Sequence, residues 1–350
     1  MKLGLISTYS TRNLGDAAIY SALAQMAPER RVHCDLAESY PTLVRGLERN
    51  GTVMGCDAFV SVGGDIFNNA RPRLVTRRFL SLLWEVLSHG RQAFVFGQSI
   101  PPSCRGAALR MLAAAFRRLG AVVVRDTRSR KLLKEHGIAA ELSYDTAFVL
   151  RPQAAAIHAA YALLERHGLV PERTVLISLR GGSAMYGLDD RECDRDLAMI
   201  TQQLTARGHQ PALLVQADCD AGDTDKMQAM RLAKLAGGVP VIDPFTIPPP
   251  MSPCEVLTAL LSVANIVVGV RYHSAILRLV SGRAPFVLYY SNKGRDLCER
   301  LSLPGQRLSS GVDEDLILAI EKSGEMSFDP NPISRDVTQH FNMCLQKVAP

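Results

Sequence analysis

The segment VVGVRYHSAIL, residues 267–277, places an arginine and a histidine two residues apart, directly after a run of apolar residues. The apolar run predicts a buried strand, so Arg271 and His273 would lie where this strand ends and a helix begins. Open α/β sheets bind ligands at the carboxyl ends of their strands. A guanidinium binds carboxylates and phosphates, and an imidazole exchanges protons near neutral pH. The pair therefore indicates a site for an anion whose reaction needs an acid or a base.

Two further cations follow predicted strands in the same half of the chain. Arg180 comes after the apolar run Val175–Leu179 and is followed by two glycines, and Lys293 follows the run Pro285–Tyr289. An arginine at the end of an apolar strand does not lie on an ordinary solvent-exposed face. Three strand ends that carry cations, together with a titratable imidazole, fit a small polyanion and acid–base chemistry.

Loops of glycine and polar residues follow the predicted strands of the first half. In TRNLGDAAIY, a polar loop opens a helix, and its glycine and N–H groups suit an anion or a substrate hydroxyl. The alternative is that Asp16 only caps this helix. In VSVGGDIF and FGQSIPP, polar residues and glycines again follow buried strands, although tight packing explains the glycines nearly as well. The candidate residues of this wall of a cleft are Asn13, Gly15, Asp16, Gly63, Gly64 and Gln98.

Three acidic motifs have simpler structural interpretations. In VVVRDTRSRKLL, we expect Asp126 to cap a helix and Arg125 to pair with a nearby carboxylate. Asp145 in SYDTAF ends a strand and could hold a cationic partner across the cleft. The segment ADCDAGD resembles a DxD metal site, but Asp218 and Asp220 are interpreted as residues of a glycine-containing turn. The sequence therefore predicts neither a metal nor a bound cofactor.

Composition sets limits on the class of protein. With 350 residues, 47% hydrophobic and 21% charged, the chain has the composition of a soluble globular protein and room for two domains. Its formal charge of +6 is interpreted as spread along the chain, and the absence of a basic run with interleaved aromatics argues against nucleic acid. The charge suits an anionic substrate or an anionic membrane surface. The eight scattered cysteines form no CxxC pair, which fits neither a zinc site nor a disulfide framework.

The N-terminal residues lack the features of a signal peptide, and no run reaches the roughly 18 apolar residues of a spanning helix. We therefore expect a cytoplasmic protein. The positive charge would also allow peripheral contact with an anionic membrane, at its inner face.

Short apolar strands alternate with amphipathic helices along both halves of the chain. Runs such as AVVV lack period-two alternation, as expected for parallel strands covered on both faces. The sequence predicts the α/β class, with two Rossmann-like doubly wound parallel-sheet domains facing across a cleft, an arrangement that resembles GT-B glycosyltransferases. The expected domains are residues 1–152 and 153–328, with a tail at 329–350 whose helix, from about Ile333 to Gln346, returns to the first domain. We also expect a helix near Leu43–Arg49.

The motifs, taken in order, resemble those of the polysaccharide pyruvyl transferase family. The matching pieces are NLGDAAI, SVGGDIF, GQSIPP, VVRDTRS, SYDTAFVL, ISLR, GVRYHSAI and YYSNK, and they span Ser7 to Lys293. One departure is Asp65 in VGGD, where a third glycine is common in the family.

The resemblance implies transfer of a pyruvyl group from phosphoenolpyruvate, the co-substrate, to two hydroxyls of a sugar, polysaccharide or lipid-linked glycan, with release of phosphate and closure of a ketal. In the family, the arginine and histidine of the RxH motif lie at the phosphoenolpyruvate site. Carried over, the donor site comprises Arg180, Arg271, Tyr272, His273 and Lys293, with Arg271 and His273 catalytic and His273 as the general acid. The acceptor is expected on the N-terminal domain.

Two alternatives remain open from the residues alone, and a third possibility keeps the donor but uses an unusual acceptor, such as a small metabolite or a lipid-linked sugar. A glycosyltransferase of the same fold would use a sugar nucleotide and bind UDP or GDP, although neither GxGxxG nor a P-loop is present. A non-catalytic homologue would bind a glycan or an anion without turnover.

Overall fold

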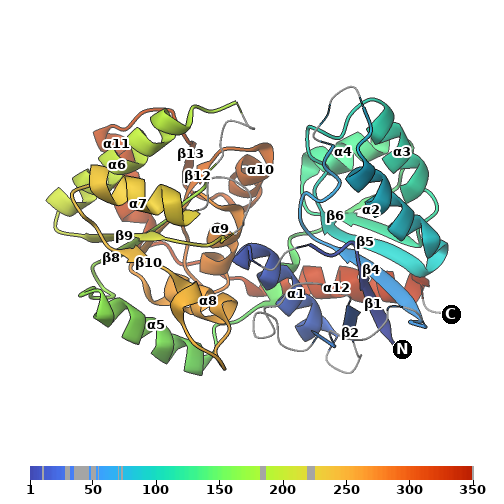
Figure 1. Cartoon of the computed structure of the whole chain (residues 1–350), viewed down its shortest axis with the longest axis horizontal. Helices are drawn as coiled ribbons and strands as arrows, with labels where there is room; N and C mark the ends of the chain where they lie inside the picture. Colours follow the sequence, from blue (N-terminus) through green and yellow to red (C-terminus); the bar gives the residue numbers. More distant parts are fainter. Residues whose placement is uncertain are drawn as a thin grey trace.

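The computed structural model contains two parallel β-sheets, one in each half of the chain, each covered by helices (Figure 1). The predicted α/β class, with two doubly wound sheets facing across a cleft, is confirmed. The structure describes residues 1–9, 12–27, 32–34, 47–48, 53, 55–69, 71, 74–181, 187–218 and 225–348.

The N-terminal sheet has the strand order β3-β2-β1-β4-β5-β6-β7, and its strands all run parallel. The order reverses direction between β1 and β4, so the connections after these two strands leave for opposite faces and a crevice opens at the carboxyl edge of the sheet. The strands are β1 (Leu3–Ile6), β2 (Val32–Cys34), β3 (Leu47–Glu48), β4 (Ala58–Val62), β5 (Ala93–Gln98), β6 (Ala121–Val124) and β7 (Glu141–Leu142).

Helices bury both faces of this sheet. Val60 and Phe94 belong to the core beneath α1 and α12, whereas Phe59 and Val95 pack in the core under α2, α3 and α4. This alternation explains why the strands are apolar throughout. The helices are α1 (Leu14–Met26), α2 (Arg77–Ser88), α3 (Ala107–Phe116), α4 (Thr127–Glu135) and, from the end of the chain, α12 (Asn331–Val348).

The C-terminal sheet repeats the same topology, with the order β10-β9-β8-β11-β12-β13 and parallel pairing. Its strand ends also open toward one edge, and the reversal falls between β8 and β11. The strands are β8 (Thr174–Ser178), β9 (Gln210–Leu214), β10 (Val241–Ile242), β11 (Ile266–Gly269), β12 (Phe286–Tyr289) and β13 (Gly305–Arg307).

Two groups of helices cover this second sheet. One core packs α6, α7 and α11 against one face, and the other face lies on α8 and α9, with α5 packed on α8. The helices are α5 (Ala154–Arg166), α6 (Asp190–Ala206), α7 (Asp225–Leu235), α8 (Pro253–Val263), α9 (Tyr272–Leu279), α10 (Asn292–Leu301) and α11 (Glu314–Ser323).

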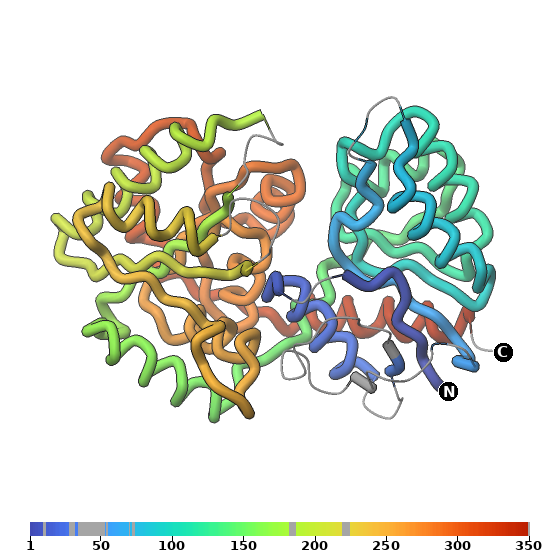
Figure 2. The backbone as a smooth tube through the Cα atoms, viewed as in Figure 1, coloured from blue at the N-terminus to red at the C-terminus, as the bar shows by residue number. Residues whose placement is uncertain are grey.

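Helices from each end of the chain cross the seam between the halves. α1 contacts α8 and α9 of the second half, and the amide of Leu14 donates to the carbonyl of Gln216 at 2.9 Å. α12 returns to the first half, where it contacts β5, β6 and the short 3-10 helix at Thr146–Val149 (Figure 2). These crossings join the two halves into one continuous core.

Two local expectations about secondary structure differ from the structure. A helix was expected near Leu43–Arg49, but Leu47–Glu48 form the edge strand β3, so the expectation is wrong at these two residues. Residues 43–46 and 49 lie outside the described residues. The strand β13 was not expected, because Gly305–Arg307 has no apolar run to mark it. Among the helices described, none is both long and apolar enough to span a bilayer.

Candidate active site

A cavity of about 240 Å³ lies between the two domains, at the carboxyl ends of both sheets. It is lined by residues from each half, so neither domain forms it alone. Eight of the predicted site residues lie on its wall: Asn13, Asp16, Gly64, Arg180, Arg271, Tyr272, His273 and Lys293.

His273 occupies the first turn of α9, and its imidazole lies against the first turn of α1 in the other domain. A methyl group built on Gly15 would fall 2.3 Å from His273 Nδ1 and 2.6 Å from Cγ. On the other side, Nε2 lies 3.4 Å from the Oδ2 atom of Asp145. The ring is therefore held between a glycine and a carboxylate of the opposite domain.

Asp145 is fully buried and accepts bonds from two other groups. Arg125 NH1 donates to Oδ2 at 2.5 Å, and the amide of Ala147 donates to Oδ1 at 2.9 Å. Burial raises the pKa of Asp145, but the charges of His273 and Arg125 outweigh burial and hold this pKa well below its usual range. Asp145 is thus an ionised partner for the imidazole across the cleft.

Asp16 lies on the same wall, in the first turn of α1. The cap of this helix is Asn13, whose side chain accepts from the amide of Gly15 at 3.1 Å. The carboxylate of Asp16 lines the cavity instead. Burial raises the pKa of Asp16 to about 6, and the opposing charges of His273 and Lys293 only limit the rise. A carboxylate with this pKa can exchange protons near neutral pH.

Arg271 is held in place by a buried carboxylate. Its Nε donates to Asp225 Oδ2 at 2.7 Å, and NH2 pairs with Oδ1 of the same side chain. Asp225, the first residue of α7, also accepts from the amides of Gln216 and Ala217. The backbone amide of Arg271 donates to Ser178 Oγ at 3.1 Å. The guanidinium therefore reaches the cavity as a fixed fork.

Lys293 and Arg125 share Asp65, the residue that departs from the family pattern. Lys293 Nζ lies 2.6 Å from Asp65 Oδ2, and Arg125 NH2 lies 3.2 Å from Oδ1. Burial alone would raise the pKa of Asp65, but these two cations lower it to about 2. Since Lys293 belongs to the second domain, this ion pair crosses the cleft.

Aromatic rings support the cations. The guanidinium of Arg180 lies 5.5 Å from the centre of the Tyr290 ring, and Arg125 and Lys293 lie 4.9 and 5.5 Å from the centre of the Tyr272 ring. A cation over an aromatic face is stabilised while it stays available to an anion.

The remaining predicted acceptor residues lie behind the wall. Gln98 is fully buried, and its amide donates to Ser61 Oγ at 3.3 Å. Gly63 has a φ of +59°, and a methyl group there would fall 2.5 Å from a side-chain carbon of Ile19. Both positions support the wall from inside the domain, and their contact with an acceptor stays a prediction.

The structure also shows the surroundings of two of the acidic motifs, VVVRDTRSRKLL and ADCDAGD. Asp126 caps α4 through the amide of Ser129, and Arg125 pairs with carboxylates, so both structural interpretations are confirmed. Asp218 accepts from Arg12 at 3.1 Å, whereas Asp220 lies outside the described residues. Within the part of the chain that the structure describes, no group of three or more His, Cys, Asp and Glu side chains could hold a metal ion.

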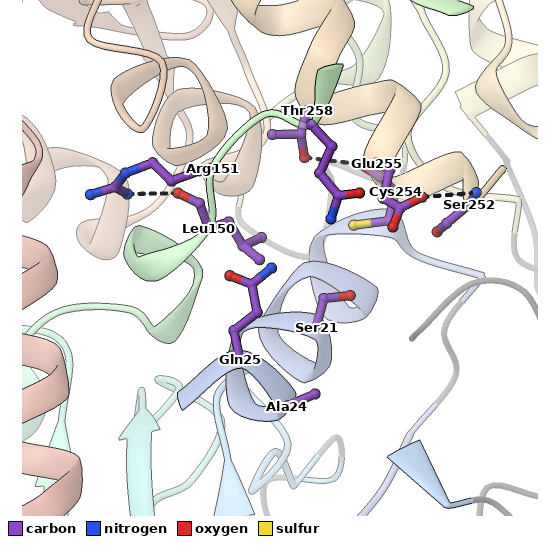
Figure 3. Close-up of a pocket in the computed structure, with 10 residues that line it drawn as sticks. Ser21, Ala24, Gln25, Leu150, Arg151, Ser252, Cys254, Glu255 and Thr258 are labelled. Carbon is purple, nitrogen blue, oxygen red and sulfur yellow. Dashed lines mark hydrogen bonds between the residues drawn. The ribbon is translucent and has the colours of Figure 1, made fainter. Parts of the chain in front are cut away.

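A second cavity, of about 310 Å³, lies between α1, α8 and the segment that joins the domains (Figure 3). Three of its polar side chains are bonded to the backbone: Thr258 donates to the carbonyl of Cys254, Glu255 accepts from the amide of Ser252, and Arg151 donates to carbonyls. Neither the imidazole nor the cations of the first cavity line it. This chemistry does not match an anionic substrate.

Several residues of the cavity, and some that hold its residues in place, have no signal in their own stretch of sequence. Asp225, for example, lies in an unremarkable helix start, and only the fold brings it to Arg271. Tyr9 follows β1, and its hydroxyl would lie 2.7 Å from a methyl group at Gly64, which has a φ of +78°. The other wall residues that the sequence did not single out are Ile66, Asn68, Arg78, Gln216 and Tyr290.

The comparison with known families decides the identity of the chain. The model of the family described as polysaccharide pyruvyl transferase matches residues 13–292. This chain belongs to that family. The amylovoran biosynthesis protein AmsJ of Erwinia amylovora is 22% identical over 258 residues, covering 71% of this chain and 60% of AmsJ. The chain thus spans about 60% of the length of the curated relative that it matches.

Solved structures share the fold of this pyruvyl transferase family member. UDP-GlcNAc 2-epimerase from Methanocaldococcus jannaschii has a TM-score of 0.57 at 10% identity, with 99% of this chain and 100% of the epimerase covered. Anabaena HepE, in complex with UDP and glucose, has a TM-score of 0.53 at 11% identity, with 97% and 99% covered. These similarities show the GT-B-like architecture of two facing Rossmann-like domains, and at such identity they show the fold alone.

Proposed function

We propose that this protein transfers a pyruvyl group from phosphoenolpyruvate to two hydroxyls of a sugar in a glycan, releasing phosphate and closing a ketal. Membership of the polysaccharide pyruvyl transferase family, together with a relative named for amylovoran biosynthesis, supports a glycan-modifying transferase. The residues of the cavity support the choice of donor, of acid and of the order of steps.

The cations of the cavity support phosphoenolpyruvate as the donor. This molecule carries a carboxylate and a phosphate on a three-carbon frame, and Arg180, Arg271 and Lys293 approach from three strand ends of one domain. Asp225 fixes the fork of Arg271, which favours a planar carboxylate or phosphate oxygens over a diffuse charge. A preorganised cation stabilises a developing charge without reorganising during the reaction.

The proposed reaction conserves atoms and electrons and uses only the donor, the acceptor and the side chains of the cavity. The first acceptor hydroxyl adds to C2 of phosphoenolpyruvate while C3 takes a proton from His273, which turns the methylene into a methyl group. Phosphate then leaves C2, and the second hydroxyl attacks the resulting cation to close the ketal. Two protons leave the hydroxyls, one is gained at C3 and one departs on phosphate, so no oxidant or reductant is needed.

The acidic residues take complementary roles in this scheme. Asp145 is ionised and lies 3.4 Å from Nε2, so it orients the imidazole that serves as the acid. Asp16, whose pKa is about 6, is largely ionised at neutral pH and accepts the proton of an acceptor hydroxyl. Asp16 belongs to the N-terminal domain, the side on which we place the acceptor.

The single observation that carries this proposal is the placement of His273, between Gly15 and Asp145 in a cavity lined by arginine and lysine. The test is transfer of labelled pyruvyl from phosphoenolpyruvate to a panel of glycosides and lipid-linked sugars by the wild type and by His273→Gln. The variant should lose transfer by about 10²-fold or more, the scale of general acid catalysis. It should bind phosphoenolpyruvate within about threefold of the wild type, because glutamine keeps polar contacts to the donor. Near-normal transfer by the variant would remove His273 from the role of acid.

A further inference from the structure

An apolar groove of about 560 Å³ lies on the N-terminal domain, between α2 and α3. These two helices cover the face of the sheet opposite α12 (Figure 1). The groove is lined by Leu80, Leu83, Trp84, Leu87, Met111 and Arg118.

The apolar side chains of this groove are exposed to an unusual degree. Trp84, the only tryptophan of the chain, is 73% exposed, and Leu80 and Met111 beside it are 39% and 40% exposed. Trp84 follows buried Leu83, and buried Phe79 and Val86 anchor α2 to the sheet. The helix is thus held by one face and presents a second apolar face outward. Contiguous apolar surface of this kind marks a binding surface.

The segment that carries the groove is strongly basic. Residues 74–136, which contain α2, α3 and α4, hold twelve arginines and lysines against three aspartates and glutamates, a net charge of +9. The whole chain has +6, so the remainder carries a net −3. The interpretation of the charge as spread along the chain is therefore wrong. The positive charge is concentrated on the segment that carries the exposed tryptophan.

Arg118 lines the apolar groove, and other arginines of α2 and α3 face solvent. Arg77 and Arg78 begin α2, Arg110 lies on α3, and Arg117 and Arg118 follow its last turn; all five side chains are exposed. No acidic residue lies between 86 and 125. Arginine can lay its aliphatic part along an apolar surface while its head contacts phosphate, and tryptophan favours the boundary between headgroups and acyl chains.

We propose that the α2–α3 groove docks the protein onto an anionic phospholipid bilayer, with Trp84 at the headgroup level and the surrounding arginines on lipid phosphates. Charge complementarity favours this occupant over a protein partner, since about 1 kcal/mol of attraction comes from each basic residue near an anionic leaflet. Docking does not depend on the proposed reaction. Helix α2 links the groove to the cavity between the domains, because Arg78 in the first turn of α2 lines that cavity. Docking therefore brings the cavity close to the membrane surface, where a lipid-linked glycan would be presented.

The sole tryptophan makes the test direct. The intrinsic fluorescence of the full chain is recorded with vesicles of phosphatidylcholine alone and with vesicles containing about 30% phosphatidylglycerol, at low and high salt. We expect a blue shift of Trp84 emission and cosedimentation with the anionic vesicles only, both lost at about 0.5 M salt because screening weakens the attraction. Cosedimentation of Trp84→Ala and of Arg110→Glu/Arg118→Glu with anionic vesicles should fall about tenfold.

Matched control variants lie on α5 of the other domain, where Tyr161 is 47% exposed and Arg166 is also exposed. Tyr161→Ala and Arg166→Glu should bind the anionic vesicles like the wild type. The proposal is overturned by absence of binding to anionic vesicles at low salt, by equal binding to neutral vesicles, or by equal losses in the α5 variants. A concentration-dependent blue shift without lipid would also overturn it, since a second copy of the chain would then cover the groove. None of these outcomes depends on pyruvyl transfer.

Discussion

The backbone of Gly15 and the imidazole of His273 come from different domains and touch, so that a methyl group on Gly15 would overlap Nδ1 at 2.3 Å. This contact explains a glycine inside the first turn of a helix, a position where alanine would otherwise favour the helix by about 1 kcal/mol. The N-terminal domain thus fixes the orientation of the side chain that we propose as the acid, while the C-terminal domain supplies it.

Replacing Gly15 with alanine should displace the imidazole with little effect on the helix. We expect pyruvyl transfer to fall by about 10²-fold, with phosphoenolpyruvate affinity changed by less than about threefold, because misplacing a catalytic group by about 1 Å costs this much. Steady-state kinetics and calorimetric titration check the two parts. Ser21→Ala, a control on the same helix, should behave like the wild type; equal turnover in Gly15→Ala would mean that the contact does not position His273.

The raised pKa of Asp16 predicts a pH dependence. If its ionised form accepts a hydroxyl proton, kcat/KM should increase as the pH rises through about 6 and then level until another group titrates. Asp16→Asn should lower kcat/KM at pH 7.5 by about 10²-fold and remove this acid limb. An unchanged limb in a variant that is still active would assign it to another group.

The raised pKa of Asp16 also makes the stability of the folded protein depend on pH. The pKa of Asp16 is higher in the folded protein, about 6, than its ordinary value of 3.8, so the folded state binds this proton more tightly. Its contribution to stability is therefore fully present below about pH 4 and is lost as the pH rises through 6. Asp16→Asn should be more stable than the wild type at pH 7, with the advantage shrinking at pH 4, as measured by urea denaturation at both values. A variant that is less stable at pH 7 would contradict a buried, disfavoured carboxylate.

The pair of Arg271 and Asp225 predicts a stability effect apart from the chemistry. Arg271→Ala leaves Asp225 buried without its cation, which should lower the free energy of unfolding by about 3 kcal/mol. Arg271→Ala/Asp225→Asn should recover much of this loss, and Arg180→Ala, at a less buried position, should cost about 1 kcal/mol or less. Urea denaturation of the three variants gives the comparison. A double variant no more stable than Arg271→Ala would show that the two side chains do not depend on each other.

The parts of the site that the sequence predicted are those marked by strand ends. The apolar runs before Arg180, Arg271 and Lys293 place each cation at the edge of a parallel sheet, and this rule needs no knowledge of the partner domain. The short strand β13 and the partner of Arg271 follow from no local pattern. Asp225 lies 46 residues before Arg271, and pairing at that distance depends on how α7 packs beside β9. Trp84 was likewise missed, because exposure of a helix face is a property of the assembled fold.

The central claim is that the cavity between the domains binds phosphoenolpyruvate, and isothermal titration tests it most directly. Phosphoenolpyruvate, UDP and GDP are titrated separately into the wild type and into Arg180→Ala, which removes a wall cation without orphaning Asp225. Our account predicts binding of phosphoenolpyruvate by the wild type, weakened at least tenfold in Arg180→Ala, and no binding of the nucleotides. Binding of UDP or GDP with none of phosphoenolpyruvate would contradict it and point to glycosyl transfer.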